Sequence, residues 1–210
     1  MDASQRRQLL DIALARARPG SGSDLHAIRE EGASYAAEAS AIPDLGPVRF
    51  VIVGGLATGR YMPARQTLDT DILVSPSDLA AVEDALQRKG CRKLGPLSVG
   101  GSAWRLPGGR ILDVRALPAD WVEEAIDRAE PDTAGHPFVA LPYLVLMKLE
   151  SGRLQDLADI ARMLGFASGE RIEATRRLVR QYRPRDVADL ESMIRLGKRE
   201  HEGANPRPSP

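Results

Sequence analysis

Residues 50–74 decide the fold, and they contain Phe50-Val-Ile-Val-Gly-Gly55 and, after a short gap, Arg65-Gln-Thr-Leu-Asp-Thr-Asp71-Ile-Leu-Val74. The run 50–53 is continuous, apolar and rich in β-branched residues, which is typical of a strand buried on both faces. The glycine pair ends this strand, and we expect a helix over 56–61. Residues 70–74 predict a second strand, which ends at Ser75-Pro76.

The segments after residue 75 alternate between helical and strand-like patterns. Residues 78–89 carry apolar side chains at helical spacing. Residues 102–106 and 110–116 are strand-like and are joined by Pro107-Gly108-Gly109, a hairpin signature. Residues 141–149 and 154–164 predict an apolar helical pair, and one or two amphipathic helices follow over 169–199. The chain is therefore expected to be α/β, with a mixed, twisted β-sheet flanked by helices, plus a C-terminal helical region.

Changes in composition divide the chain into four regions. Residues 1–47 predict an N-terminal helical segment, 48–140 the α/β core and 141–202 the C-terminal helical region. Residues 203–210 contain three prolines and no apolar pattern, so we expect a disordered tail. A chain of 210 residues can bury a sizeable core without disulfides or metals to hold it together.

The composition limits the compartment and the partners. Cys91 is the only cysteine, which excludes an internal disulfide and suits the cytoplasm. No run approaches the roughly 20 apolar residues that a membrane helix needs, so we expect no membrane partner. Lys plus Arg and Asp plus Glu both number 29, but residues 171–199 hold nine basic and four acidic residues. That local excess could meet a polyanion such as RNA, or it could be a solvated helix face.

The acidic residues near position 70 predict a metal site. Arg65, Thr67, Asp69 and Asp71 occupy alternate positions, so on an extended chain they share one face. Two carboxylates at i and i+2 repel each other, a cost that a cation normally offsets. Asp113 offers a third carboxylate if its strand lies beside that of Asp69. Oxygen ligands of this kind are those that Mg²⁺ prefers.

Nucleotidyl transfer needs this arrangement, because two Mg²⁺ ions about 4 Å apart bridge the triphosphate and activate the attacking hydroxyl. A glycine pair at a strand end lets backbone N–H groups approach phosphate oxygens. Each feature alone is more often structural: Gly-Gly forms turns, and Asp-x-Asp lies on solvated strand edges. Their order along the chain is what favours the catalytic interpretation.

Two motifs carry a resemblance to a known family. Val53-Gly-Gly-Leu-Ala57, followed by Arg65-x-Thr67-x-Asp69-x-Asp71-Ile72, resembles the polymerase-beta-type nucleotidyltransferase superfamily. Within it, the chain is most similar to the branch that contains the AbiEii toxins of type IV toxin–antitoxin systems. Leu146-Met-Lys148-Leu-Glu-Ser-Gly-Arg153-Leu-Gln-Asp156-Leu-Ala-Asp159 resembles the helical motif of that branch, and the likeness covers roughly residues 48–165.

The resemblance implies a nucleotidyltransferase fold and a role for each matching residue. Asp69 and Asp71 would hold the metal, and Asp113 would complete the site or act as base. The residues implied to bind the nucleotide or its phosphates are Gly54, Gly55, Thr58, Arg65, Thr67, Lys148 and Asp156. Lys148 is also costly to bury in an apolar helix unless an anion meets it; the alternatives are solvent or a pair with Asp156 or Asp159.

Two positions depart from the family pattern. Leu56 stands where many members carry Ser, so Thr58 would have to supply that phosphate hydrogen bond. Gln155 stands where related toxins often carry Lys. Neither change touches the expected metal site.

The implied activity is transfer of a nucleotide from a nucleoside triphosphate (NTP) to an acceptor hydroxyl, with Mg²⁺ (or Mn²⁺) as cofactor. The first-choice acceptor is RNA, at the end of a tRNA, and a cognate antitoxin is an expected partner. An aminoglycoside-like small molecule or a protein hydroxyl fits the same site. A non-catalytic nucleotide-binding member of the fold is the alternative from another class.

Overall fold

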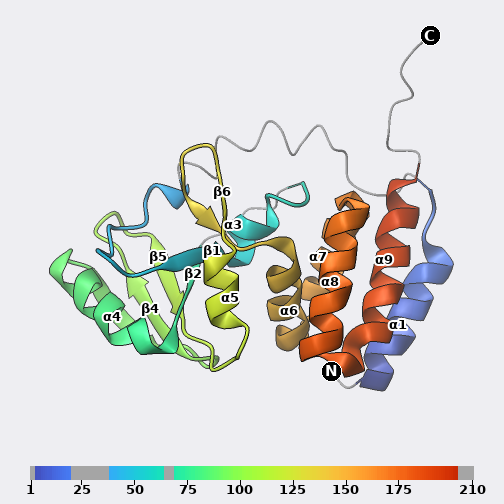
Figure 1. Ribbon diagram of the computed structural model, residues 1–210, viewed down its shortest axis with the longest axis horizontal. Helices are drawn as coiled ribbons and strands as arrows, with labels where there is room; N and C mark the ends of the chain where they lie inside the picture. The colour runs from blue at the N-terminus through green and yellow to red at the C-terminus, as the bar shows by residue number, and fades with distance from the viewer. Residues whose placement is uncertain (1–2, 20–37, 64–68, 203–210) are drawn as a thin grey trace, which may run out of the picture. The chain divides into compact units, whose positions relative to one another are not determined.

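The computed structural model describes residues 3–19, 38–63 and 69–202, and the chain forms two compact units (Figure 1). The sheet unit comprises residues 30–60 and 64–140, and the helical unit comprises residues 1–29, 61–63 and 141–210. Arg65, Thr67 and the predicted tail 203–210 lie outside the described residues, as does 20–37 of the predicted N-terminal segment. No helix in the described ranges is long and apolar enough to cross a membrane.

Within the described residues, the sheet unit has one mixed sheet of seven strands. The strands are β1 (Phe50–Val53), β2 (Asp69–Val74), β3 (Arg92–Pro96), β4 (Gly101–Arg105), β5 (Ile111–Arg115), β6 (Glu130–Pro131) and β7 (Pro137–Phe138). Their order is β3-β4-β5-β2-β1-β7-β6. β2 pairs with β5, and β1 with β7, in parallel, whereas all other neighbours are antiparallel. The mixed sheet, the flanking helices and the β4–β5 hairpin are as predicted.

The helices of the sheet unit are short. They are α3 (Gly54–Thr58), the 3₁₀ turn η1 (Pro76–Asp78), α4 (Leu79–Arg88) and α5 (Val122–Asp127). The prediction of a helix over 56–61 was wrong in its limits, because α3 begins directly at the glycine pair. It ends when the N–H of Gly59 donates to the carbonyl of Gly55. α3 and α5 both contact β2, so they lie beside the strand that carries the Asp pair.

The core of the sheet unit is formed by its central strands. Val51, Ile52 and Val53 are fully buried, as expected for an apolar run in the middle of a sheet. Trp104 is also fully buried, and its indole N–H donates to Ser102 Oγ at 2.8 Å. The Ser102 hydroxyl donates in turn to Glu83 on α4, so the buried indole nitrogen keeps a satisfied partner.

The helical unit contains α1 (Ala3–Arg16), α6 (Leu141–Ser151), α7 (Leu154–Phe166), α8 (Gly169–Tyr182), the 3₁₀ turn η2 (Pro184–Asp186) and α9 (Val187–His201). Gly152, at φ +62°, separates α6 from α7, so the predicted break is confirmed. α6 packs on α8, and α9 packs on both α7 and α1. α7 and α9 approach closely at Gly197, where a Cβ would lie 1.9 Å from the carbonyl oxygen of Ala161.

Ion pairs connect α1 to η2 and α9. Arg6 Nη2 lies 2.6 Å from Asp186 Oδ1, and Arg6 Nε lies 2.5 Å from Asp189 Oδ2. Arg7 Nη2 is 2.5 Å from the other oxygen of Asp189. Both carboxylates are buried, so these cations compensate charges that water cannot reach.

Candidate active site

β2 and β5 bring the predicted carboxylates together. The two strands are parallel neighbours, and Asp71 is the direct register partner of Asp113. Directly paired residues point to the same face of a sheet, and Asp69 shares that face because it lies two residues before Asp71. The condition placed on Asp113, that its strand lie beside that of Asp69, is therefore met: Asp69 pairs with Ile111 at the start of β5.

An arginine that the sequence reasoning missed also belongs to this face. Arg115 lies two residues after Asp113 on β5, and its side chain reaches Asp71. Its Nε donates to Asp71 Oδ1 at 2.8 Å, and its Nη2 lies 2.7 Å from the same oxygen. The alternation of Asp113 and Arg115 along β5 was the signal that could have revealed it.

Gly54 lies directly against the second oxygen of Asp71. It has φ +63°, a conformation that side-chain-bearing residues rarely adopt. A Cβ at this position would come within 1.9 Å of Asp71 Oδ2. Glycine is therefore needed here both for its backbone conformation and for the space that the Asp71 carboxylate occupies.

Burial, together with the neighbouring carboxylates, raises the pKa of Asp113. Burial has the largest effect, and the negative charge of Asp71 adds to it. Arg115 acts in the opposite direction, while Asp69 again raises the pKa. Asp113 is thus an acid whose charged form the surroundings disfavour, which is the behaviour expected where a cation is still to be bound.

The donor set suits a hard divalent cation in its chemistry, because it consists of carboxylate oxygens on one face. In the part of the chain that the structure describes, no group of three or more His, Cys, Asp or Glu side chains is arranged to hold a metal ion. The guanidinium of Arg115 contacts Asp71 Oδ1, one of the oxygens that a metal at this face would use.

Helix α3, which follows β1 directly, carries Gly55 and Thr58, two of the residues predicted to meet phosphate. Gly55 lies in the first turn of α3, and Thr58 in its last. The hydroxyl of Thr58 donates to the carbonyl of Gly54 at 2.8 Å, and only 1% of this residue is exposed. Its hydroxyl proton is therefore engaged within α3, and its predicted phosphate contact, like that of Gly55, stays a prediction.

Lys148 and Asp156 lie in the helical unit, where they form a buried cluster. Lys148 Nζ donates to Asp159 Oδ2 at 2.7 Å and to Asp156 Oδ1 at 3.1 Å. Although burial raises the pKa of Asp156, hydrogen bonds from Ser151, Lys148 and Arg153 and the charge of Lys148 outweigh it and lower that pKa. The structure thus has the ion-paired form of Lys148, one of the alternatives that the sequence left open.

The chain was compared with known proteins. No protein-family model matches it, and no curated protein does. Among solved structures it is similar to ANT(2″)-Ia in complex with adenylyl-2″-tobramycin, at 18% identity over 81% of this chain and 94% of that chain, with a TM-score of 0.40. A solution structure of the antibiotic-resistance factor ANT(2″)-Ia gives 17% identity over 93% of both chains and a TM-score of 0.40.

A third solved structure is the Thermotoga maritima CCA-adding enzyme complexed with tRNA. It is 14% identical over 88% of this chain and 50% of that chain, with a TM-score of 0.33. At these identities and TM-scores the likenesses assign no function, so the proposal below rests on the geometry of the site.

Proposed function

We propose that this chain is a metal-dependent nucleotidyltransferase that moves a nucleotide from an NTP to an acceptor hydroxyl. The observation that carries the proposal is the pairing of Asp71 with Asp113 on adjacent parallel strands, with Asp69 on the same face. Carboxylates that share one face of two adjacent strands repel one another, and a bound cation would offset that repulsion.

The metal would be Mg²⁺ or Mn²⁺, held by Asp69, Asp71 and Asp113. Once bound, it would neutralise charge on the phosphates and make the acceptor hydroxyl more acidic. Asp113 is the residue proposed to accept the hydroxyl proton, because its raised pKa makes its carboxylate a stronger base than an ordinary aspartate.

The triphosphate would lie beside the β1–α3 junction. Gly54 and Gly55 carry no side chains, so phosphate oxygens could approach their backbone N–H groups on the side away from the Asp71 carboxylate, which lies against Gly54. Thr58, Arg65, Thr67, Lys148 and Asp156 are proposed as further nucleotide-binding residues on the strength of the sequence resemblance alone.

The acceptor that we propose is RNA, with the end of a tRNA as the first choice. The excess of basic residues over 171–199 supports an anionic acceptor rather than a cationic aminoglycoside. By the resemblance to toxin-like proteins, a cognate antitoxin is a further proposed partner.

The test is transfer of label. Purified protein is incubated with Mg²⁺, each radiolabelled NTP in turn, and total tRNA, beside the variant Asp69→Asn, Asp71→Asn. Label on RNA with the intact protein alone would support the proposal and identify the nucleotide. Label on an added aminoglycoside or on protein, with none on RNA, would leave the reaction class standing and replace the acceptor.

One observation favours a second candidate, a nucleotide-binding protein without turnover. The Arg115 guanidinium occupies an Asp71 oxygen that a metal would use. A binder of this kind would hold NTP equally well with and without Mg²⁺, and would transfer no label to any acceptor. Equilibrium dialysis of labelled NTP with Mg²⁺ or EDTA separates the two functions.

A further inference from the structure

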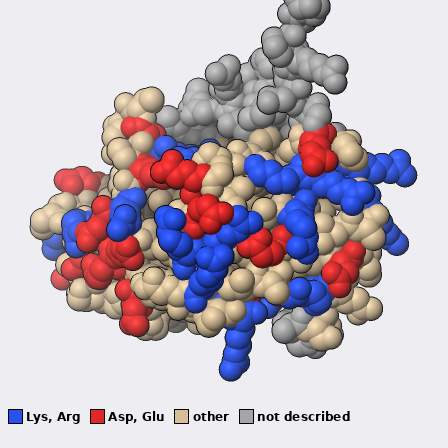
Figure 2. Space-filling view, turned by 45° about the vertical axis from the view of Figure 1, so that its right-hand side comes forward, with Lys and Arg blue, Asp and Glu red and all other residues tan. Residues whose placement is uncertain are grey.

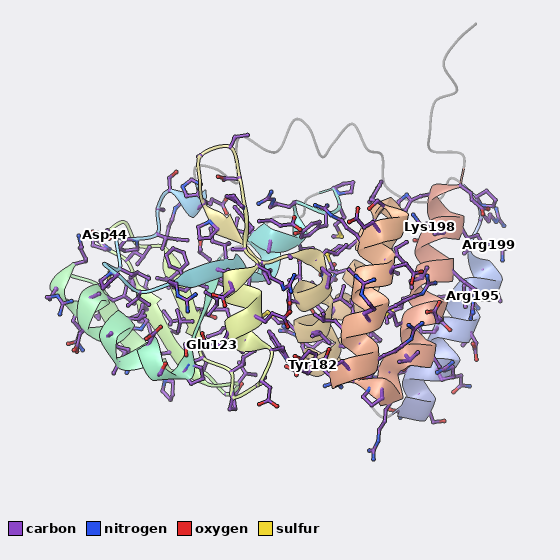
Figure 3. All side chains as sticks on the ribbon, in the orientation of Figure 1. Asp44, Glu123, Tyr182, Arg195, Lys198 and Arg199 are labelled. Carbon is purple, nitrogen blue, oxygen red and sulfur yellow. The ribbon has the colours of Figure 1, made fainter. Side chains whose placement is uncertain are left out.

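A pocket of about 480 Å³ lies in the helical unit, where the last turns of α1 and α9 meet. It is lined by Leu14, Arg195, Lys198, Arg199 and Glu202. The three basic residues follow i, i+3, i+4 spacing and so share one face of α9, as the labelled side chains in Figure 3 indicate. The lining carries three positive charges against the single carboxylate of Glu202.

These cations differ from other basic residues of the unit in their partners. Arg176 is held by Glu191, at 2.7 Å, and by Glu173, at 2.5 Å. Among the described residues, by contrast, Arg195, Lys198 and Arg199 form no ion pair with a carboxylate.

Their hydrogen bonds go to neutral oxygens. Arg195 Nη2 donates to Ser192 Oγ at 3.1 Å, and Arg199 Nη1 donates to the carbonyl of Leu14 at 3.4 Å. Lys198 Nζ donates to the carbonyls of Gly165, at 3.0 Å, and Ala167, at 2.7 Å. Three positive charges thus lie together at the pocket, and Glu202 is the single acid among its lining residues, while Arg195 also acts on Glu191 at longer range.

The pKa of the neighbouring His201 reflects the positive charges near the pocket. The pKa of His201 is lowered, first by burial and then by the charges of Lys198 and Arg162. Burial also lowers the pKa of Lys198. The potential at this end of the unit is therefore one that an anion would relieve.

The helix dipole explains only part of the cluster. Cations in the last turn of a helix stabilise its C-terminus, which accounts for Lys198 and Arg199 on α9. Arg195 lies one turn earlier, beyond the range of that effect. Lys198 also donates to the carbonyls at the end of α7, so Arg195 is the cation of this cluster that neither the helix dipole nor an ion pair accounts for.

We propose that this pocket binds phosphate groups of a polynucleotide and is the docking surface for the nucleic-acid acceptor. The role of the bound nucleic acid as acceptor rests on the proposed function. Phosphate binding rests on the pocket alone. Arginine suits the role because its planar fork of donors matches two phosphate oxygens at once. Figure 2 shows Lys and Arg side chains close together on the right-hand side, where the helical unit comes forward.

The test compares two variants that remove the same charge. The pocket variant is Arg195→Gln, Arg199→Gln, which keeps Lys198 because that residue caps α7. The control is Arg88→Gln, Arg92→Gln, which removes two exposed arginines from α4 and β3 of the sheet unit. Binding of fluorescein-labelled tRNA, and of single-stranded DNA of equal length, is measured by anisotropy at several salt concentrations.

We expect the pocket variant to bind tRNA roughly tenfold more weakly or worse at low salt. For the single-stranded DNA, the slope of log affinity against log salt should become shallower by about 1.4, since each of two lost phosphate contacts on a single strand removes about 0.7. The control should keep the wild-type slope, and circular dichroism melting should show both variants folded. An equal loss on DNA supports recognition of phosphate alone, and a loss on tRNA alone supports the pocket with RNA as its ligand.

Two results would overturn the proposal. One is a pocket variant whose affinity and salt slope match those of the control. The other is unchanged affinity for both nucleic acids together with lost binding to polyglutamate, which would assign the pocket to an acidic protein partner.

Failure of the pocket is distinguishable from failure of the enzyme. If no NTP is transferred and the pocket variant still loses tRNA binding, the transferase proposal falls and the pocket stands. If transfer occurs and the pocket variant binds tRNA normally, the pocket proposal falls and the transferase proposal stands.

Discussion

The guanidinium of Arg115 donates a hydrogen bond from Nε to one oxygen of Asp71 and brings Nη2 within 2.7 Å of the same oxygen, while the other oxygen of that carboxylate lies against Gly54. A candidate metal ligand is thus held on both sides by the protein itself. Arg115 takes the place of part of the cation charge at the site, and a bound metal would compete with it for the same oxygen.

Arg115→Ala should therefore have two opposite effects. Without metal, unfolding by urea in EDTA should show a loss of about 2 kcal/mol, because the buried Asp71 carboxylate loses its partner. Mn²⁺, titrated by electron paramagnetic resonance, should bind several-fold more tightly, because the competing cation is gone. Arg115→Lys is the control that keeps the charge; an Ala variant with unchanged Mn²⁺ affinity would show that Arg115 does not compete with metal.

Gly54→Ala should destabilise the sheet unit and displace Asp71. A left-handed alanine costs about 1–2 kcal/mol, and its Cβ would also collide with Asp71 Oδ2. We expect a total of at least about 2 kcal/mol in urea unfolding. Gly55→Ala is the matched control, because Gly55 lies in α3 without a positive φ. Equal effects at the two positions would contradict the special role of Gly54.

Asp113→Asn should make the protein more stable at neutral pH and inactive. The pKa of Asp113 is raised in the folded state, so its contribution is fully present below the unfolded pKa and is lost as pH rises through the folded pKa. Removing the charge should stabilise by up to about 1 kcal/mol near neutrality, and the gain should vanish in acid. Urea unfolding in EDTA at both pH values tests this, and an Asn variant that is less stable near neutrality would refute it.

Lys148→Met should be strongly destabilising, by about 3–5 kcal/mol, because it leaves Asp156 and Asp159 buried without their shared cation. Lys148→Met with Asp159→Asn should recover part of that stability. NTP affinity of the folded double variant, measured by calorimetry, then tests the phosphate role directly. Wild-type affinity would remove Lys148 from the nucleotide site.

Stability should fall as pH drops from about 7.5 to 5.5, where a free histidine takes up its proton. The pKa of His201 is lowered in the folded state, so the unfolded chain binds that proton first and folding loses free energy as pH falls through the unfolded value. His201→Gln should flatten this part of the profile of unfolding free energy against pH. A profile as steep as that of the wild type would show that His201 is not the group responsible.

The parts of the fold that sequence could predict are those with strong local patterns. The apolar run of β1, the Asp-x-Asp strand β2 and the turn between β4 and β5 were all identified. β3 was missed because Arg92–Pro96 has no apolar alternation and owes its extended form to pairing with β4. β6 and β7 have two residues each, too few to show any period.

The candidate site was predictable to the same extent. Asp71 and Asp113 follow from alternation and strand order, and their register confirms that they are neighbours. Alternation along β5 could have placed Arg115 on the same face as Asp113, but its contact with Asp71 depends on the pairing of β5 with β2, which the sequence does not show. Arg65 and Thr67 lie outside the described residues, so their roles stay predictions.

In the sequence, α1 of the helical unit comes before the sheet unit, and α6, α7, α8 and α9 come after it. During synthesis on the ribosome, α1 emerges long before α9, the helix that neutralises Arg6 and carries its packing surface. A helix of 14 residues is marginal alone in water. Because α1 depends on its contacts with α9 and on the carboxylates of Asp186 and Asp189, we expect it to reach its native packing only after α9 has been synthesised.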